Sequence, residues 1–522
     1  MTAGHRIDNG GAGDVTYERG ERNGRRSEPS APSARSARNG PGDSRAGRTR
    51  RSWESITVVD LDLDGPFEDR TDHTDRPGHG GIGSHHHGYQ VLSLTPAPGG
   101  PLPAGEGDVY ALVRLRGRPV ATVLGRVREG ADPPEVLTAA FAARRAPDGG
   151  TRIPPAPPVP PAHAESPATP PRTTVVVATR ERAGQLARAL DSLLAQDHPD
   201  FRVLVVDNAP LTTATRDLVE SRYAGRVDRV TEPRPGLAAA HNRGVAAADG
   251  HGVIAFTDDD VVADPRWLTS LTAPFAADPG LGCVTGLILP ARLTTPAQIL
   301  LESHGGFAKG FEPRLYDPVR PPADEPLFPF TAGSFGSGAN MAFRADALRA
   351  VGGFDPATGT GTPARGGDDL YAFVRVLTAG HRLLYTPDAL VWHHHRETWQ
   401  DLRDQAYGYG AGLTAYLTAL VVRHPALLPA LLAKLPRGLA HARAITAHRT
   451  DGTNRAEGAD GADGADRVYG ADGADGAVPG AHGAHTHPWP RALSRLERRG
   501  MLYGPIGYVK ARRRLRTRGG RA

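Results

Sequence analysis

The sequence contains a single cysteine, Cys283, among its 522 residues, so no disulfide can form within the chain. It has no spacing of cysteines and histidines typical of a structural zinc site. The Arg-rich amino-terminal region also has no apolar core of the kind that marks a secretory signal. These absences argue against secretion, and we expect the protein to work in the reducing environment of the cytoplasm.

Long apolar runs are missing as well. No stretch reaches the roughly 18 apolar residues that a membrane-spanning helix needs. The nearest candidates, 413–422 and 426–435, are separated by Arg423 and His424. We interpret this region as amphipathic or buried helix. A helical hairpin packed on the folded domain and a shallow contact with a membrane are both consistent with it.

The sequence has no large excess of charge. The formal net charge is +5, and much of the positive charge lies in the two terminal segments. Without a central basic stripe, nucleic-acid binding is not indicated. The basic segment 491–518 mixes Arg and Lys with apolar residues, which fits both a solvated terminus and a peripheral contact with anionic lipid at the inner face of the membrane.

Glycine and proline, with 64 and 47 residues, are abundant and concentrate at the ends and in linkers. The folded part is therefore smaller than the length suggests. We predict a disordered basic tail, a small β-containing domain, a Pro/Ala-rich linker, an α/β domain, a helical extension, a Gly-Ala-Asp linker and a basic tail, at residues 1–52, 53–147, 148–171, 172–400, 401–449, 450–482 and 483–522.

The hydrophobic pattern changes character between the two predicted domains. In the small domain, residues 109–123 are typical of a β-hairpin that turns at Gly117. In the larger domain, apolar runs at 174–178, 201–206 and 253–256 alternate with segments of helical periodicity. This alternation predicts an α/β fold with a mostly parallel sheet covered by helices.

Three consecutive carboxylates, Asp258, Asp259 and Asp260, follow the apolar run that ends at Phe256. Ligands of α/β sheets gather at the carboxyl ends of strands, so these acids would face a cleft. Adjacent carboxylates repel one another unless a cation relieves the repulsion, and a hard divalent ion is the natural partner. A solvated acidic turn is the alternative, but the neighbouring motifs favour a metal site formed by Asp258 and Asp260.

Other polar residues follow predicted strands at the same edge of the sheet. Asp207 ends the second strand, where a carboxylate can hydrogen-bond a base or a ribose, and residues 179–182 follow the first strand. Asn242 and Arg243 lie near the start of a predicted helix and suit contacts with a nucleotide diphosphate. The remaining motifs are an acidic helix start at 366–370 and a histidine-rich strand end at 391–396.

In this order, the motifs resemble those of family 2 glycosyltransferases of the GT-A fold. The match covers about residues 173–410 and includes Gly-Ala-Asn-Met at 338–341 and Gly-Gly-Phe-Asp at 352–355. The resemblance implies that a sugar moves with inversion from a nucleotide-sugar donor to an acceptor hydroxyl, with Mg²⁺ or Mn²⁺ as cofactor. Cell-envelope polysaccharides, glycolipids and secondary metabolites are the acceptors that we consider.

The resemblance also implies roles for individual residues. The implied general base is Asp369. The implied metal ligands are Asp258, Asp260 and His393, with His394 and His395 as alternatives to His393. The implied donor contacts are Thr179, Arg180, Glu181, Asp207, Asn242, Arg243, Asp258 and Asp259. The implied acceptor contacts are Gly338, Asn340 and Asp368.

Two positions depart from the family pattern. Asp368 stands where glutamate is common, and His241 replaces a common arginine, which makes a charge near the donor pH-dependent.

Two other functions are alternatives to a glycosyltransferase. A nucleotidyltransferase of related fold would carry a Gly-rich, basic loop after the first strand, and residues 179–184 do not resemble one. A non-catalytic sugar- or nucleotide-binding protein would have lost the base or the metal pair, and both are present.

Overall fold

The computed structural model of the chain describes residues 54–65, 85–103, 105–145, 170–248, 250, 252–303, 306–434, 436–438 and 489–519. The described residues form one compact unit. The tail predicted at 1–52 and the Gly-Ala-Asp linker predicted at 450–482 lie outside the described residues, as does nearly all of the linker predicted at 148–171.

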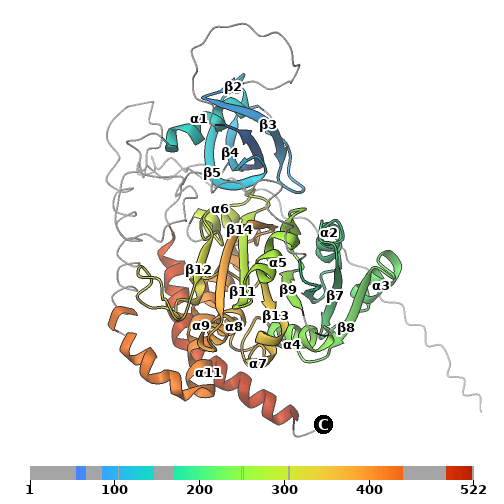
Figure 1. Ribbon diagram of the computed structural model, residues 1–522, viewed down its shortest axis with the longest axis vertical. Helices are drawn as coiled ribbons and strands as arrows, with labels where there is room; N and C mark the ends of the chain where they lie inside the picture. Colours follow the sequence, from blue (N-terminus) through green and yellow to red (C-terminus); the bar gives the residue numbers. More distant parts are fainter. Residues whose placement is uncertain are drawn as a thin grey trace, which may run out of the picture. The chain divides into compact units, whose positions relative to one another are not determined.

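The amino-terminal part of the described chain folds into a five-stranded sheet, drawn in blue in Figure 1. The hairpin predicted around Gly117 is confirmed, because β4 and β5 pair antiparallel and Gly117 has a φ of +82°. Leu137 and Phe141 of α1 are buried against the sheet. The elements are β1 (Thr57–Asp64), β2 (His85–His86), β3 (Tyr89–Pro96), β4 (Gly107–Leu115), β5 (Arg118–Val127) and α1 (Pro133–Arg145).

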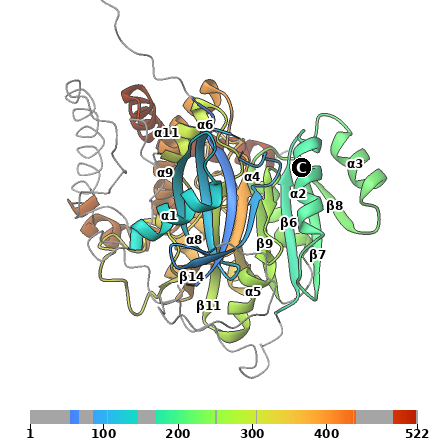
Figure 2. The same cartoon turned by 90° about the horizontal axis from the view of Figure 1, so that it is seen from above.

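A nine-stranded sheet flanked by helices forms the larger part of the structure, as Figures 1 and 2 show, and the predicted α/β class is confirmed. The strand order is β10-β14-β11-β13-β9-β6-β7-β8, and β12 pairs with β14. Strands β6, β7, β8 and β9 run parallel, whereas β13 is antiparallel to β9 and β11. The sheet is therefore mixed, with β13 running antiparallel between β9 and β11.

The elements of this sheet alternate along the chain. The strands are β6 (Thr173–Thr179), β7 (Phe201–Asn208), β8 (Val227–Glu232), β9 (Val253–Asp258), β10 (Val261–Ala263), β11 (Leu281–Pro290), β12 (Arg314–Tyr316), β13 (Asn340–Arg344) and β14 (Arg382–His393). The helices are α2 (Ala183–Leu193), α3 (Ala214–Arg222), α4 (Leu237–Ala247), α5 (Trp267–Ala277), α6 (Pro296–Ser303), η1 (Ala332–Ser334), α7 (Ala345–Ala350) and α8 (Asp368–Thr378).

Burial on both faces explains why the central strands are continuous apolar runs. In β6, Val176 belongs to one apolar cluster, while Val175 and Val177 belong to another on the opposite face. Leu186 and Leu190 of α2 join the second cluster. A parallel strand covered by helices on both sides is expected to have this composition, because no position along it faces water.

Two carboxyl-terminal helices, α9 (Trp399–Arg423) and α11 (Arg491–Gly519), run side by side in Figures 1 and 2. The basic segment 491–518 is therefore a docked helix over its described length. Glycines permit the close approach, because a Cβ atom at Gly410 would collide with the Glu497 carbonyl. The buried Tyr508 hydroxyl also donates to Asp355 Oδ2 at 2.9 Å.

Among the described residues, no single helix is long and apolar enough to cross a membrane. The pair formed by α9 and the helix at Pro425–Lys434, which begins with η2 (Pro425–Leu427), meets the length and composition criteria only in combination, with a bend of 111° between the two parts.

The five-stranded sheet shares an apolar cluster with the nine-stranded one. Ile56 and Tyr110 belong to this cluster together with Leu289 of β11. Arg114 of β4 adds an ion pair across the same contact, with its Nη2 at 2.6 Å from Asp264 Oδ2. The small sheet thus packs directly on the strands that end near the candidate site.

Candidate active site

The carboxyl ends of three parallel strands lie next to one another and carry polar side chains. In the strand registers, Thr179 at the end of β6 pairs with Asp207 of β7, and Ala178 pairs with Asp258 of β9. The buried bodies of these strands hold their ends in place. The polar residues that the sequence places after separate strands therefore lie along one edge of the sheet.

A cluster of potential metal ligands forms where β9 and β14 end. One ligand atom each from Asp258, Asp260 and His393 lies within 4.8 Å of the others. His393 Nε2 is 3.3 Å from Asp260 Oδ1. Two carboxylate oxygens and one imidazole nitrogen fit Mn²⁺ or Mg²⁺. Among the described histidines, neither His394 nor His395 joins such a cluster.

The electrostatics of the cluster also suit a cation. Burial, with the adjacent charge of Asp260, raises the pKa of the Asp258 carboxyl. Burial acts in the same direction on Asp260, but His393 and Arg182 outweigh it and hold the pKa of Asp260 well below its usual range. The two carboxylates repel each other, and a divalent ion between them would offset the negative charge of both.

Asp259 points away from this cluster. Its Oδ2 accepts a hydrogen bond from the Thr179 hydroxyl at 2.7 Å, and its Oδ1 accepts one from Arg182 Nη1 at 3.0 Å. The same Arg182 nitrogen is 3.1 Å from Asp260 Oδ2. Thr179 and Asp259 therefore support the acidic turn, and their contact with the donor stays a prediction. Arg182 lies in the segment 179–182 after β6, but the sequence did not indicate that it binds these carboxylates.

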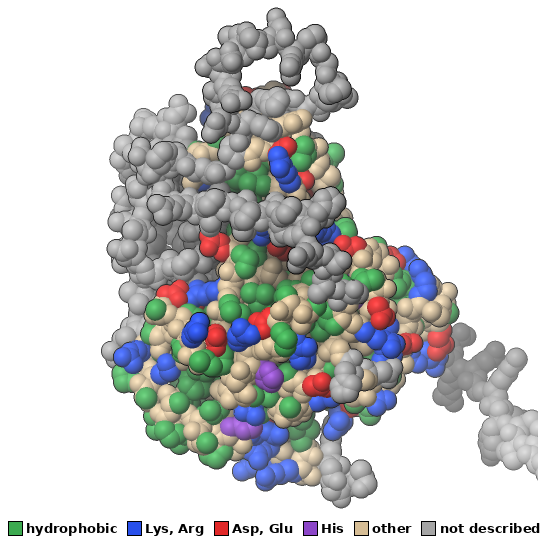
Figure 3. Space-filling view, in the orientation of Figure 1, with side chains coloured by type: hydrophobic (Ala, Val, Ile, Leu, Met, Phe, Trp, Pro, Cys, Tyr) green, Lys and Arg blue, Asp and Glu red, His purple; other side chains and the backbone are tan. Residues whose placement is uncertain are grey.

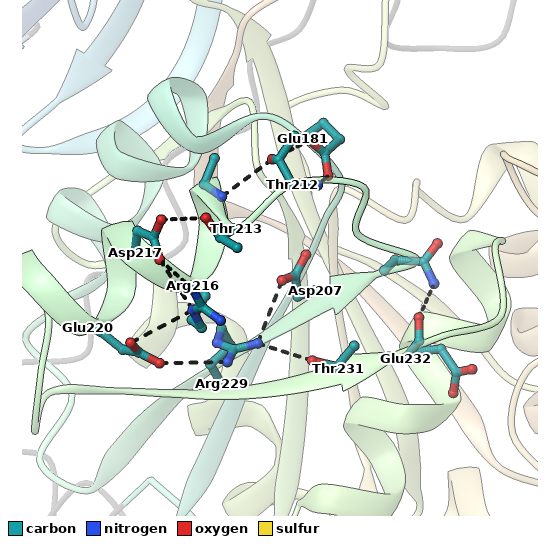
Figure 4. A network of polar contacts seen from close by, with 12 residues as sticks. Glu181, Asp207, Thr212, Thr213, Arg216, Asp217, Glu220, Arg229, Thr231 and Glu232 are labelled. Atoms are coloured by element: carbon teal, nitrogen blue, oxygen red, sulfur yellow. Dashed lines mark hydrogen bonds and ion pairs between the residues drawn. The ribbon is translucent and has the colours of Figure 1, made fainter. Parts of the chain in front are cut away.

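Figure 4 shows the polar network on the β7 and β8 side. Arg229 Nη1 lies 3.6 Å from Asp207 Oδ2, while Asp207 Oδ1 is buried without a hydrogen-bond partner among the described residues. Burial raises the pKa of Asp207, and Arg229 offsets part of the shift. Glu181 instead accepts hydrogen bonds from the backbone and the hydroxyl of Thr212. Asp207 thus has a free acceptor where the sequence predicted a nucleoside contact.

The other predicted donor contacts lie in different environments. Arg180 and Arg243 are exposed. Asn242 uses its amide to hold the backbone of Phe354, with its Nδ2 donating at 2.8 Å and its Oδ1 accepting at 3.0 Å. The side chain of Asn242 therefore anchors α4 to the segment before α8, and a role for these three residues in donor binding stays a prediction.

The predicted base, Asp369, is the second residue of α8, which follows Gly367, whose φ of +88° only glycine adopts readily. Its Oδ2 accepts a hydrogen bond from the Gly338 amide at 2.9 Å. Burial, and then the neighbouring Asp368, raise the pKa of Asp369 to about 6. Burial also lowers the pKa of Lys309, and the nearby Asp369 counteracts this shift. No sequence signal pointed to Lys309, which lies in an irregular segment.

The three residues predicted to contact the acceptor already make contacts within the protein. Gly338 holds the base through its amide, and Asp368 Oδ2 is 3.3 Å from His241 Nδ1. Asn340 is fully buried, and its amide donates to two backbone carbonyls while its oxygen accepts from Trp267 Nε1 at 2.9 Å. The amide of Asn340 thus ties three elements together, and contact of these residues with an acceptor stays a prediction.

A hollow opens beside the metal-ligand cluster. Its volume is about 460 Å³. The lining combines three guanidinium groups with three carboxylates, namely Arg188, Arg292, Arg396, Asp260, Glu397 and Asp401. Guanidinium groups favour phosphate oxygens, so the three arginines suit a phosphate group next to the cluster.

Comparison with known proteins places this arrangement in a family. Residues 170–407 match the family described as glycosyltransferase like family 2. A pre-mycofactocin glycosyltransferase of Mycobacterium tuberculosis is 30% identical over 277 residues, which are 52% of this chain and 50% of the relative. A glucosyl-dolichyl phosphate glucuronosyltransferase of Haloferax volcanii is 25% identical over 239 residues, 42% of this chain and 69% of the relative. The chain spans about half the length of the first of these relatives.

Alignments with solved structures have lower sequence identity. A mannosyltransferase from Pyrobaculum calidifontis in complex with GDP-Man and Mn²⁺ aligns with a TM-score of 0.37 and 23% identity, over 55% of this chain and 76% of that chain. GalNAc-T7 with UDP, GalNAc and Mn²⁺ aligns with a TM-score of 0.35 and 17% identity, over 49% of this chain and 52% of that chain.

The sheet and its acidic edge, together with the family match, define a glycosyltransferase domain. More narrowly, residues 170–407 are a glycosyltransferase domain of family 2, and the family predicted from the sequence motifs is confirmed.

Proposed function

We propose that the protein transfers a sugar with inversion from a nucleotide-diphosphate donor to an acceptor hydroxyl, in a reaction that depends on Mg²⁺ or Mn²⁺. The observation that carries this proposal is the clustering of Asp258, Asp260 and His393 near the segment before β13, where the Gly338 amide binds Asp369. Asn340 of β13 pairs with Thr257 of β9, so Gly338, which binds Asp369, lies close to the end of β9.

Each group has a distinct task in this mechanism. Asp369 accepts the proton of the acceptor hydroxyl at its carboxylate as the new bond to the anomeric carbon forms. Asp258, Asp260 and His393 would hold the cation, and a bound divalent cation would offset the negative charge that develops on the leaving diphosphate. Asp207 accepts a hydrogen bond from the nucleoside. Direct attack from the face opposite the diphosphate inverts the anomeric carbon.

The test is a panel of UDP-, GDP- and dTDP-sugars with Mn²⁺ or Mg²⁺, assayed for release of nucleoside diphosphate and for transfer. Pre-mycofactocin and a lipid-linked glucosyl phosphate are acceptors to include, because relatives carry these names. We expect release with one donor only in the presence of metal, loss of release in Asp260→Ala, and loss of transfer in Asp369→Asn. NMR of the product would give its anomeric configuration.

Three results would contradict the proposal. Retention of the anomeric configuration would exclude direct displacement. Release of pyrophosphate from a nucleoside triphosphate and a sugar phosphate would indicate a nucleotidyltransferase. Binding of nucleotide without any turnover, in protein shown to be folded, would indicate a non-catalytic sugar- or nucleotide-binding protein.

We also propose that the protein is cytoplasmic and contacts the inner face of the membrane through α11. Leu502, Ile506 and Val509 are spaced by four and three residues, which places them on one helix face, and they are 79%, 54% and 42% exposed. Arg498 and Arg513 extend the same face on either side. Figure 3 shows Lys and Arg gathered at the bottom of the view, where the end of α11 lies in Figure 1. An apolar stripe flanked by cations suits an anionic lipid surface.

Co-sedimentation with vesicles tests this contact. We expect binding to phosphatidylglycerol vesicles, little binding to phosphatidylcholine vesicles, and several-fold weaker binding of Leu502→Ser. Leu211→Ser is the matched control, because Leu211 is 78% exposed on a different surface. Equal binding by the two variants, or no binding by the intact chain, would refute the contact.

A further inference from the structure

A chain of polar contacts runs from the metal-ligand cluster to the amino-terminal sheet. His393 Nε2 is 3.3 Å from Asp260 Oδ1, and His393 Nδ1 is 2.9 Å from His395 Nδ1. His395 Nε2 is then 3.2 Å from Glu302 Oε2. The Tyr110 hydroxyl, which belongs to β4, donates to Glu302 Oε1 at 3.2 Å. Four contacts therefore connect the metal-ligand cluster to the amino-terminal sheet.

The chain of contacts is enclosed along its length. His395 and Tyr110 are 2% and 3% exposed, and the Glu302 side chain is 8% exposed. The Phe307 ring covers both imidazoles, with centroid distances of 5.3 Å to His393 and 5.7 Å to His395. With little water to replace a lost partner, each contact depends on the next one being in place.

A cation held by His393 would fix the proton positions along this chain of contacts. If the lone pair of His393 Nε2 bound the cation, the proton of His393 would sit on Nδ1 and be donated to His395 Nδ1. His395 must in turn carry its own proton on Nε2, which faces the carboxylate of Glu302. A carboxylate can only accept here, and it also receives the Tyr110 hydroxyl. In this arrangement every contact has one donor and one acceptor: His393 donates to His395, and both His395 and Tyr110 donate to Glu302.

We propose that His395, Glu302 and Tyr110 are positioning residues that orient His393 for metal binding, so that the amino-terminal sheet forms part of the outer shell of the metal site. This inference rests on the proposed role of the cluster as a metal site. Partners of this kind fix the tautomer and the ring orientation of a ligating histidine, and their loss weakens metal affinity by about 10- to 100-fold. The function of the small sheet in this proposal is to hold Glu302 in place through the hydroxyl of Tyr110.

The test measures Mn²⁺ affinity directly on the full chain, by electron paramagnetic resonance of the free ion. We expect Glu302→Ala to weaken binding about 10- to 100-fold. Glu302→Gln, which keeps an acceptor oxygen but loses the charge, should lie between Glu302→Ala and the intact protein. Tyr110→Phe should weaken binding roughly two- to fivefold, because it removes one of two contacts to Glu302.

A matched control separates this effect from a general loss of packing. Tyr223→Phe also removes a hydroxyl bonded to a carboxylate, since Tyr223 is buried and its hydroxyl donates to Asp191 Oδ1 at 2.8 Å. This variant should bind Mn²⁺ like the intact protein, and thermal unfolding followed by circular dichroism would show that all variants are folded.

The outcomes distinguish the two proposals. If the intact chain does not bind Mn²⁺ and Asp260→Ala makes no difference, the proposed metal site itself is wrong. If the intact chain binds Mn²⁺ and a folded Glu302→Ala binds it equally well, the metal site stands and the positioning role is refuted. Equal weakening in Tyr223→Phe and Tyr110→Phe would also refute it, because the effect would then not be specific to this chain of contacts.

Discussion

The protonation of Asp369 should control the rate of transfer at low pH. A general base must be deprotonated to accept the hydroxyl proton, so the rate should rise as pH increases through the pKa of this carboxyl. Burial and the adjacent Asp368 raise that pKa to about 6. With a pKa near 6, roughly one eleventh of the protein is active at pH 5 and roughly ten elevenths at pH 7, so kcat should change about tenfold between them.

Replacing the neighbour tests the physical cause of the shift. Asp368→Asn removes a charge that raises the pKa of Asp369, so the ascending limb of the pH profile should move to lower pH. Glu135→Gln is a suitable control, because Glu135 also lies in the first turn of a helix but is exposed and belongs to α1 of the amino-terminal part.

The assay is kcat between pH 5 and pH 8 with donor, acceptor and Mn²⁺ all saturating, so that weaker metal binding at low pH does not imitate the effect. A limb that stays at the same pH in Asp368→Asn would show that the two carboxylates do not interact as the structure indicates. A pH-independent kcat limited by chemistry would remove Asp369 from the role of base altogether.

Three further predictions concern how the structure holds the site. Replacing Arg182 with Met leaves two buried carboxylates without this cation, so we expect a loss of about 1–3 kcal/mol in the free energy of unfolding in urea, together with weaker Mn²⁺ binding. Asn340→Leu should cost about 1–3 kcal/mol by the same assay because Trp267 loses its partner, while an unchanged KM for the acceptor would show that Asn340 only has a structural role. Gly410→Val should cost at least about 1–3 kcal/mol, because the added atoms collide with α11, and an unaltered urea midpoint would contradict the packing of α9 on α11.

Much of the fold and the place of the site could be predicted from the sequence. The apolar runs at 174–178, 201–206 and 253–256 are β6, β7 and β9, because strands buried on both faces leave a continuous apolar signal. Parallel strands have their carboxyl ends at one edge, so residues that follow them, such as Asp207 and Asp258, had to lie close together.

The sequence could not predict which way individual side chains point within a motif. Asp259 faces Thr179 and Arg182, whereas its neighbours on either side face His393. Side-chain direction in a turn depends on the local backbone and on partners about 80 residues away in the chain, and neither has a local signal. For the same reason the sequence favoured His393 as the ligand but left His394 and His395 as alternatives.

The family, the sheet and the edge that carries the acids were thus determined by local patterns, because burial and strand direction are visible in a single segment. Only the tertiary structure decided that α11 docks on α9 and that Tyr110 reaches Glu302 behind the metal ligands. Contacts between residues 192 positions apart depend on the packing of two sheets, and the composition of neither segment encodes such a meeting.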